Sequence, residues 1–403
     1  MSLNAYIVAA VRTPAGKNRG LLSQWQPADL GGFVLDALVA RAGIDAAHVD
    51  DVIMGCVSQI GAQSGNLGRM AVLASKSFPI SVPGTTVDRQ CGSSLQALHF
   101  AAQAVQSGAH DVVIAAGVES MSLIPIGASI MDGIAAGRGN PNAAEGIQKR
   151  YPGVMFSQFE GAELVAEHYG VPRAAMDQLA VESHRRAHEA TQQGRFKREI
   201  VPTPGFDKKA NKDVLVDQDE GIRWPTTLDK LSQLPTLKDG GRITAATASQ
   251  ISDGASAMLI VNERGLRRLG LKPRARVVAM ALAADDPVMM LSAPIPASFK
   301  VLEKAGLSIG DIDLYEVNEA FASVPLAWAK ELKADLKKLN VNGGAMALGH
   351  PLGCTGTKIM TTLLHELERR NARYGLCSIC EGGSTANAII IERVTSPLAT
   401  AKL

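Results

Sequence analysis

An internal repeat is the feature that most constrains how this chain folds. The segment A-R-A-G-I-D-A-A-H-V-D-D-V-I-M-G (residues 40–55) matches E-K-A-G-L-S-I-G-D-I-D-L-Y-E-V-N (residues 303–318). In each copy an amphipathic helix ends at Ala-Gly, and an aspartate of the next strand follows seven residues after the glycine. Glycine is expected there because it adopts the left-handed conformation that ends a helix without strain. The match predicts two similar structural units.

The repeat continues beyond these segments. In the first copy a glycine-containing turn leads into a helix at residues 93–107 and then the apolar strand D-V-V-I-A-A-G. In the second copy a similar turn leads into a helix at residues 357–370 and then the strand G-L-C-S-I-C-E-G-G. Apolar strands that alternate with helices are typical of α/β proteins with sheets covered on both faces. We expect two α/β units, residues 1–272 and 273–403.

The stretch from residue 122 to residue 250 differs from the rest of the chain in its many turn-forming residues. It contains several turn-forming clusters, among them G-R-G-N-P-N, V-P-T-P-G-F-D and W-P-T-T,. One long helix stands out, beginning near Pro172 and ending near Gly194,. We expect residues 122–250 to form a loop domain inserted into the first unit.

Charge and composition exclude several classes of function. The chain has 403 residues, of which 41 are basic and 39 acidic, and this balance gives no reason to expect a nucleic-acid-binding surface,. No segment reaches the ~18 uncharged apolar residues of a membrane span. The start, M-S-L-N-A-Y-I-V-A-A-V, is typical of a strand rather than a signal peptide,.

Five cysteines without framework spacing indicate a reducing compartment, and we expect the cytoplasm,. The tail Ala401-Lys402-Leu403 is similar to a peroxisomal address, although a chance match is the favoured interpretation,.

Cys91 lies in V-D-R-Q-C-G-S-S, directly before the helix at residues 93–107. A cysteine at a helix N-terminus faces unpaired backbone N–H groups, which lower the pKa of its thiol. The alternative is a buried cysteine of the core, but the flanking Asp88 and Arg89 and the following glycine favour a reactive position. We expect Cys91 to be a nucleophile with a lowered pKa.

His350 lies in G-G-A-M-A-L-G-H-P-L-G-C-T-G, a turn with five glycines between residues 343 and 356. Glycines allow the backbone to approach a ligand closely, and histidine is the natural base for a thiol. A phosphate-binding loop is the rival, but the order G-x-x-x-x-G-K-[ST] is absent. We expect His350 to ionise Cys91. His184 and His188, four residues apart, are interpreted as a solvated helix face rather than metal ligands.

Cys380 belongs to a C-x-x-C pair with Cys377 at the end of an apolar strand. Zinc would need a second pair, which the sequence lacks, so no metal is expected. Cys377 is interpreted as core. Gly382 and Gly383 lie shortly after Cys380. Their backbone N–H groups can point into a site, where they could stabilise an oxyanion. One thiol that carries an acyl group, an imidazole and a second thiol that moves a proton are the groups that carbon–carbon bond exchange between thioesters requires.

From Tyr6 to Glu392 the chain resembles the thiolases, the acetyl-CoA C-acyltransferases. The resemblance rests on R-T-P near the start, R-Q-C-G-S-S-L-Q-A, N-E-A-F-A, G-G-A-M-A-L-G-H-P-L-G-C-T-G and C-E-G-G. It implies two β-α-β-α-β-α-β-β halves in a five-layer α-β-α-β-α sandwich with an inserted loop domain. It also implies acyl-CoA and coenzyme A as substrates, no tightly bound cofactor, and a homodimer or homotetramer.

The resemblance implies roles for nine residues. Cys91 takes the acyl group, His350 activates it, and Cys380 moves the proton of the α-carbon. Asn318 holds a water that, with His350, stabilises the enolate oxygen, while the backbone N–H groups of Cys91 and Gly382 form a second oxyanion hole. The positions that match the family's coenzyme A contacts and its pantetheine and acyl pocket are Arg223, Ser249, Met290 and Phe321.

Four departures from the family pattern stand out. Asp88 replaces an asparagine and Ser384 replaces the last glycine of C-x-G-G-G, and neither change is expected to alter the chemistry. The family's M-G-x-[ST]-[AS]-E is Q-F-E-G-A-E at residues 158–163, and its P-x-x-M-G-x-G-P is P-V-M-M-L-S-A-P at residues 287–294. These two segments border the acyl pocket in the family, so acyl length and shape stay open.

Two other functions compete with a 3-oxoacyl-CoA thiolase. A decarboxylating condensing enzyme of the ketosynthase kind has a similar architecture but uses a Cys-His-His or Cys-His-Asn set, without a second catalytic cysteine. A non-catalytic acyl-CoA-binding subunit needs none of Cys91, His350 and Cys380, so their presence weighs against it.

Overall fold

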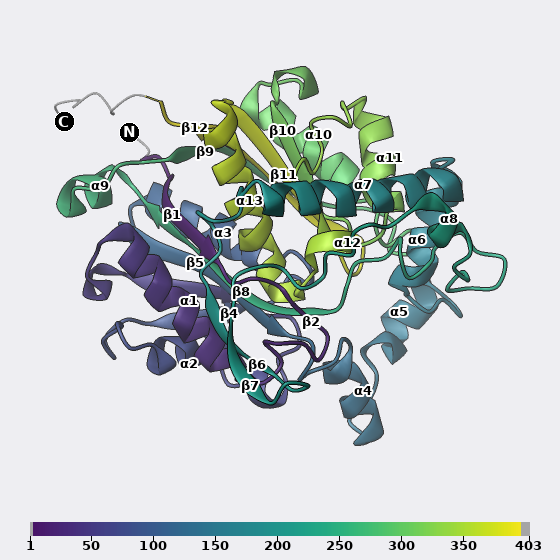
Figure 1. Cartoon of the computed structure of the whole chain (residues 1–403), viewed down its shortest axis with the longest axis horizontal. Coiled ribbons are helices and arrows are strands. Elements are labelled where there is room, and N and C mark those ends of the chain that lie inside the picture. Colours follow the sequence, from purple (N-terminus) through teal and green to yellow (C-terminus); the bar gives the residue numbers. More distant parts are fainter. Residues whose placement is uncertain (1–2, 396–403) are drawn as a thin grey trace.

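Ten strands form one mixed sheet in the order β10-β11-β12-β9-β1-β8-β5-β3-β4, with the short β2 paired to β8 (Figure 1). The structure is a computed structural model that describes residues 3–395. The strands are β1 (Tyr6–Arg12), β2 (Gly16–Lys17), β3 (Asp51–Gly55), β4 (Gly84–Val87), β5 (Val112–Ser120), β8 (Ser252–Val261), β9 (Ala275–Ala284), β10 (Leu314–Val317), β11 (Tyr374–Glu381) and β12 (Thr385–Arg393).

The sheet consists of two strand sets joined by a narrow link. β1 pairs with β9 through only two residue pairs, Tyr6 with Arg276 and Ile7 with Ala275, whereas β5 and β8 pair along nine residues. The first strand set is therefore β4-β3-β5-β8-β1 and the second is β9-β12-β11-β10. In the first set β4 and β5 both run parallel to β3, and in the second β10 runs parallel to β11.

Helices separate and cover the two strand sets. The helices of these layers are α1 (Pro27–Ala42), α2 (Leu67–Ala74), α3 (Ser93–Ser107), α10 (Pro294–Ala305), α11 (Ser323–Leu332) and α13 (Thr355–Arg370). Buried side chains of α1 and α2 pack on the first strand set, and those of α10 and α11 pack on the second. Side chains of α3 and α13 form one cluster with strands of both sets, here called the middle core. This is the five-layer α-β-α-β-α arrangement that the resemblance to the thiolases implied.

The predicted repeat is present in the backbone. α1 ends at Ala42 and α10 at Ala305, and the glycine after each helix is left-handed, with φ of 68° at Gly43 and 65° at Gly306. Each glycine donates its N–H to two carbonyls of the last helical turn. A short 3-10 turn and then β3 or β10 follow in both copies. The helix end is therefore fixed by the same local chemistry twice.

Between β5 and β8 the chain leaves the sheet. This part contains α4 (Ala128–Ala135), α5 (Glu145–Arg150), α6 (Gln158–His168), α7 (Arg173–Gln192), the hairpin β6 (Thr203–Asp207) and β7 (Lys212–Val216), and α8 (Leu228–Ser232). α6 packs on α11, and α7 packs on α12 (Ala345–Leu348). In Figure 1 α4 and α5 lie farthest from the layers. The remaining helix, α9 (Glu263–Leu269), follows β8. Within residues 3–395, none of the helices has the length and apolar character that a membrane crossing requires.

Candidate active site

Cys91 lies in a tight turn between β4 and α3. Gln90 has a left-handed φ of 49°, and its N–H donates to Asp88 Oδ1 at 2.7 Å. Ser93 closes the turn, since its Oγ donates to the Gln90 carbonyl at 2.6 Å and accepts from the Arg89 N–H at 2.9 Å. Asp88, which departs from the family pattern, thus acts through an oxygen that an asparagine would also supply.

His350 follows α12 at a glycine that no other residue could replace. Gly349 has φ of 76°, and a Cβ there would lie 2.3 Å from Ser252 Oγ. The His350 N–H donates to the Gln250 carbonyl at 3.1 Å, which fixes the turn against the segment before β8. His350 is buried, with 3% of its surface exposed.

The hydrogen bonds of His350 define its tautomer. Thr355 Oγ1 donates to the Pro351 carbonyl at 2.9 Å and lies 2.6 Å from His350 Nδ1. The hydroxyl proton is therefore engaged, so Nδ1 carries the hydrogen and donates to Thr355. Nε2 then carries the lone pair, which accepts from Asn318 Nδ2 at 3.3 Å and is the position that can take a proton,. Thr355 was not singled out from the sequence.

Asn318 lies just past the end of β10. Its N–H donates to the Ser378 carbonyl of β11 at 3.1 Å, which continues the parallel ladder. Its Oδ1 is buried and has no hydrogen-bond partner among the described residues. A buried amide oxygen rarely stays without a donor, so this atom is suited to hold a water or a substrate group.

Two contacts bring the turn of Cys91 and the turn of His350 to one place. Ser94 Oγ accepts from the Thr357 N–H at 3.0 Å, so the first turns of α3 and α13 touch. Asn387 of β12 donates from Nδ2 to the Gly92 carbonyl at 2.9 Å. The reactive turn of the first half therefore packs on the second half, next to the end of β11.

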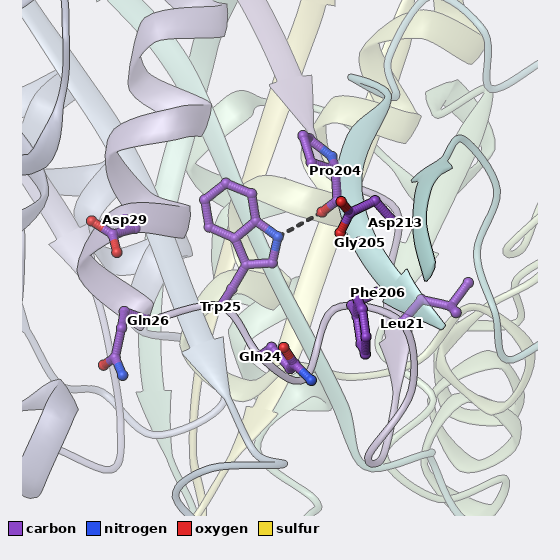
Figure 2. A pocket seen from close by; sticks show the side chains of 9 residues that line it. All are labelled: Leu21, Gln24, Trp25, Gln26, Asp29, Pro204, Gly205, Phe206 and Asp213. Carbon is purple, nitrogen blue, oxygen red and sulfur yellow. Dashed lines mark hydrogen bonds between the residues drawn. The ribbon is translucent and has the colours of Figure 1, made fainter. Parts of the chain in front are cut away.

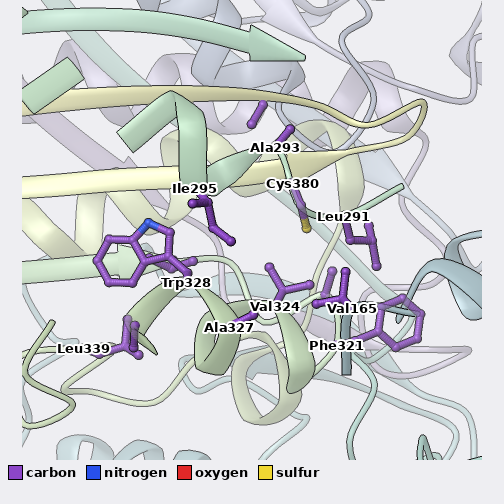
Figure 3. Close-up of a cluster of buried hydrophobic side chains, with 14 of the residues drawn as sticks. Val165, Leu291, Ala293, Ile295, Phe321, Val324, Ala327, Trp328, Leu339 and Cys380 are labelled. Atoms are coloured by element: carbon purple, nitrogen blue, oxygen red, sulfur yellow. The ribbon is translucent and has the colours of Figure 1, made fainter. Parts of the chain in front are cut away.

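Cys380 lies on the opposite face of β11 from Cys377. Cys377 belongs to the middle core, whereas Cys380 belongs to the cluster formed by α6, α10 and α11. Figure 3 shows the Cys380 sulfur pointing into this cluster, near Leu291 and Val324. The two cysteines alternate across a strand and do not meet, which leaves Cys377 a core residue as predicted,.

Removal from water keeps the half-buried Cys91 and the buried Cys380 and His350 uncharged,. Burial and the neighbouring Glu381 raise the pKa of the Cys91 thiol to about 12. Burial and Cys91 raise the pKa of Cys380 well above its usual value. Burial and Lys358 lower the pKa of His350 to about 3. The lowered Cys91 pKa expected from the helix N-terminus was wrong, because desolvation and a nearby acid outweigh the backbone dipoles. Cys91 therefore needs a base, and a neutral imidazole can serve as one.

Two backbone N–H groups beside the thiols have no acceptor. Neither Cys91 nor Gly382 donates its backbone N–H to any residue that the structure describes. Gly382 packs on Gln90, since a Cβ at Gly382 would lie 3.0 Å from Gln90 Oε1. Ser384, where the family has glycine, keeps a left-handed φ of 55°. Unpaired donors at a buried site are suited to an anionic oxygen.

Arg223 lies at a pocket of about 200 Å³ that also contains Lys230 and His184. The pocket reaches the His350 turn through Gln250, whose Nε2 donates to the Met346 carbonyl at 2.6 Å. His184 is buried, and its Nδ1 accepts the Arg223 N–H at 3.1 Å. Its interpretation as a solvated face was wrong: the helix packs inward there, and burial lowers the pKa of His184 to about 4. Lys230 was not singled out from the sequence, because it belongs to no motif.

The other three candidates lie around the Cys380 cluster. The Ser249 N–H donates to the Ala320 carbonyl at 2.9 Å, next to Phe321. Phe321 is buried and meets Phe159 edge-on, with ring centroids 5.5 Å apart. Met290 has a left-handed φ of 57°, and its Sδ accepts the Gly383 N–H at 2.9 Å.

A second hollow, of about 280 Å³, lies elsewhere (Figure 2). It is open and is lined around Trp25, whose Nε1 donates to the Pro204 carbonyl at 2.7 Å. It contains none of the candidate catalytic residues, so its size alone does not make it a reaction site.

Comparisons with known proteins agree with this geometry. The family model of the thiolase N-terminal domain matches residues 5–264, and that of the thiolase C-terminal domain matches residues 271–393. Steroid 3-ketoacyl-CoA thiolase FadA6 of Mycobacterium tuberculosis is 50% identical over 97% of this chain and 94% of its own length. 3-Ketoacyl-CoA thiolase of Serratia proteamaculans is 43% identical over 97% of this chain and 100% of its own length.

A solved structure has the same fold. The crystal structure of the Bacillus anthracis acetyl-CoA acetyltransferase superimposes with a TM-score of 0.88 at 37% identity, covering 98% of this chain and 99% of that one. With both family models matched and relatives aligned over nearly their full length, the chain belongs to the thiolase family.

Proposed function

We propose that this protein is a 3-oxoacyl-CoA thiolase that works through an acyl group carried on Cys91. The observation that carries the proposal is the meeting of the two turns at the end of β11. The turn of Cys91 is bonded to β12 through Gly92 and Asn387, and α3 is bonded to α13 through Ser94 and Thr357. This arrangement gathers a thiol, a neutral imidazole and a second thiol from distant parts of the chain.

The first half-reaction begins with Cys91. His350 Nε2 takes the thiol proton, and the thiolate attacks the 3-oxo carbon of the substrate. The oxyanion that forms lies on the unpaired N–H groups of Cys91 and Gly382,. The bond between C2 and C3 breaks, and its electrons form the enolate of acetyl-CoA. His350 and a water held by Asn318 stabilise the enolate oxygen, and Cys380 gives its proton to C2.

The second half-reaction releases the shortened acyl-CoA. The Cys380 thiolate takes the proton of the coenzyme A thiol, which attacks the acyl group on Cys91. The Cys91 thiolate leaves and recovers its proton from His350. Run backwards, the same steps are a Claisen condensation. The neutral resting states of both thiols suit this sequence, since each cysteine must lose and regain one proton per cycle,.

We propose that coenzyme A enters through the pocket of Arg223 and Lys230, because two cations suit the phosphates of the ligand,. Ser249, Met290 and Phe321 would then line the path of the pantetheine arm and the acyl group to Cys91 and Cys380. The acyl group would be apolar, since the buried cluster that contains Cys380 also contains Leu291 and Val324 (Figure 3). The names of the relatives place 3-ketoacyl-CoA thioesters, including steroid ones, among the substrates to test.

Thiolysis of 3-oxoacyl-CoA is tested directly with acetoacetyl-CoA, longer 3-oxoacyl-CoAs and a steroid-side-chain analogue, each with free coenzyme A. We expect consumption of at least one of them and a labile acyl group on Cys91 by mass spectrometry. No loss of any substrate would contradict the proposal, and an unmodified Cys91 would favour the non-catalytic alternative.

Replacement of the second cysteine distinguishes a thiolase from a ketosynthase-like enzyme. Cys380→Ala should lower kcat at least about 10³-fold, because the proton of C2 has no other donor. Cys377→Ala is the matched control, since Cys377 lies in the same strand on the opposite face. Full activity of Cys380→Ala would favour the ketosynthase-like alternative.

Three further properties follow from family membership and belong to the proposal. We propose two halves at residues 1–272 and 273–403, no tightly bound cofactor, and a homodimer or homotetramer in the cytoplasm. Light scattering of the purified protein tests the assembly, and a monomer would contradict it. The tripeptide Ala401-Lys402-Leu403 lies outside the described residues.

A further inference from the structure

Glu381 is a buried acid between the two reactive thiols that the proposed reaction does not use. It follows Cys380 directly and has no exposed surface. Its Oε2 accepts the Thr385 hydroxyl at 2.6 Å, while its Oε1 is buried without a hydrogen-bond partner among the described residues. A Cβ on Gly92 would lie 2.0 Å from Oε1. The unpartnered oxygen is therefore pressed against the backbone next to Cys91.

The groups that face Glu381 do not neutralise a carboxylate. Arg89 and Asp88, from the turn before α3, oppose each other in charge. On β12, Thr385 supplies one hydroxyl, and the Asn387 amide is committed to the Gly92 carbonyl. Within residues 3–395, Glu381 takes part in no ion pair. Burial raises the pKa of Glu381 to about 8, and the Thr385 hydroxyl, Arg89 and the Asn387 backbone N–H offset part of that rise.

We propose that Glu381 is a positioning residue that works as an uncharged carboxylic acid, so that negative charge can form on Cys91 and on the oxyanion beside Gly382. The proposal rests on the proposed function. During the reaction negative charge appears first on the Cys91 sulfur and then on the substrate oxygen between the Cys91 and Gly382 N–H groups. A carboxylate in the same buried space would oppose both charges.

The charge of Glu381 should make the reactivity of Cys91 fall at alkaline pH. Below its folded pKa Glu381 is neutral, and the Cys91 thiolate forms against burial and the weaker effects of Glu119 and Asp88. Above it the carboxylate raises the pKa of both Cys91 and Cys380. Deprotonation of Glu381 therefore makes Cys91 less reactive at a pH where a thiol normally becomes more reactive. The enzyme should lose acyl transfer on the alkaline side.

Alkylation of Cys91 by iodoacetamide, followed by mass spectrometry from about pH 6.5 to about pH 10, tests this without substrate. Glu381→Gln puts a neutral isostere at the site. At about pH 9.5 its Cys91 should be alkylated at least tenfold faster than in the unsubstituted protein, which corresponds to about one pKa unit. Glu303→Gln, which removes the same charge from an exposed position, should follow the unsubstituted protein. Superimposable profiles for Glu381→Gln and the unsubstituted protein would overturn the proposal.

Turnover provides the second readout. In the unsubstituted enzyme kcat/KM should fall above about pH 8, and in Glu381→Gln this fall should be absent, while Glu381→Asp should keep it. An alkaline fall that persists in Glu381→Gln would overturn the proposal. An absence of turnover in the unsubstituted protein contradicts the proposed function instead, and alkylation still decides the role of Glu381.

A second variant covers the case in which Glu381→Gln does not fold. The Thr385 hydroxyl stabilises the charged carboxylate, so Thr385→Val should raise the pKa of Glu381 further. The break in the alkylation profile should then move to a higher pH. An unmoved break would overturn the proposal.

Discussion

At the scale of single residues, the tautomer of His350 depends on one hydroxyl that no motif identifies. Thr355→Val keeps the shape of the side chain but removes the acceptor of the Nδ1 hydrogen. Either tautomer then becomes possible, and the form with hydrogen on Nε2 cannot accept the Cys91 proton. We expect kcat/KM to fall about 10- to 100-fold. Steady-state kinetics with a thermal melt measures this, and a full rate in a folded variant would contradict the assigned tautomer.

Leu291 departs from the thiolase family pattern, and we expect its side chain to determine which acyl groups fit the site. The family has glycine at this position, and here the side chain is buried in the same cluster as Cys380 (Figure 3). Leu291→Ala should raise kcat/KM for a bulky acyl-CoA relative to acetoacetyl-CoA by about tenfold, because the removed carbons widen the space at the thiol.

Leu302→Ala is the control for that variant. Leu302 is buried in the same cluster but lies on α10, so its truncation costs stability of a similar kind, about 2–5 kcal/mol,. Selectivity should stay unchanged in this control. An equal change of selectivity in both variants would show that loosening of the cluster, and not space at Cys380, is the cause.

Sequence reasoning could identify groups with chemistry in a motif but not the groups that tune them. Cys91, His350 and Cys380 stand out because each lies among glycines. Their pKa directions depend on how much water is excluded and which charges lie near in space, and Glu381 raises the pKa of Cys91 from the other half of the chain. Thr355 contacts a ring five residues away through a turn that the sequence alone does not define.

At the scale of elements, the approach of α3 to α13 depends on one glycine. A Cβ on Gly356 would lie 2.1 Å from the Leu95 backbone nitrogen. Because this is a backbone atom, the clash could be relieved only if the two helices moved apart. Gly356→Ala should therefore lower the free energy of unfolding by about 3 kcal/mol or more and separate Cys91 from His350. Urea unfolding measures the loss.

Gly133→Ala is the matched control within a helix. Gly133 lies inside α4, and a Cβ there meets no atom within 4 Å. This change should leave the protein equally stable or stabilise it by up to about 1 kcal/mol. Equal effects of the two substitutions would show that the contact with Leu95 is not what fixes the helix pair.

Elements with strong local signals were predictable, and those held by distant contacts were not. The helix at residues 93–107 matches α3, and the long helix after Pro172 matches α7, since a glycine or a proline marks their ends. The antiparallel join between β1 and β9 has no sequence signal, because two residue pairs make it. The short α4, α5 and α8 lie among turn residues, where neither periodicity nor length separates a helix from a loop,.

At the scale of the whole molecule, one arginine ties three parts of the fold together. Arg12, at the end of β1, donates to Glu199 Oε1 at 2.7 Å and to both oxygens of Asp219 at 2.7 and 3.0 Å. Glu199 also accepts from Thr362 of α13 at 2.9 Å, and Asp219 accepts the Ala15 N–H at 2.7 Å. All three charged side chains are buried. The network thus fastens the segments after α7 and β7 to the layered body.

Removal of the Arg12 side chain should lower the free energy of unfolding strongly, because Glu199 and Asp219 stay buried. Burial by itself lowers the pKa of Arg12, but Asp219 and Glu199 outweigh burial and raise it. Arg12→Met removes the cation that is hydrogen-bonded to both buried carboxylates, and we expect the free energy of unfolding to fall by about 3–5 kcal/mol,. Urea unfolding measures this, and a loss below about 1 kcal/mol would contradict the prediction.

The triple variant Arg12→Met, Glu199→Gln, Asp219→Asn separates the pairing from the space that the side chains fill. If unpaired charge is the cause, neutral amides should recover at least half of the lost stability, because a buried amide costs far less than a buried carboxylate. Limited proteolysis after α7 should then be faster in Arg12→Met than in the triple variant. Equal stability of the single and triple variants would mean that Arg12 acts through packing, including its place over the Phe196 ring at 5.1 Å, rather than through its charge,.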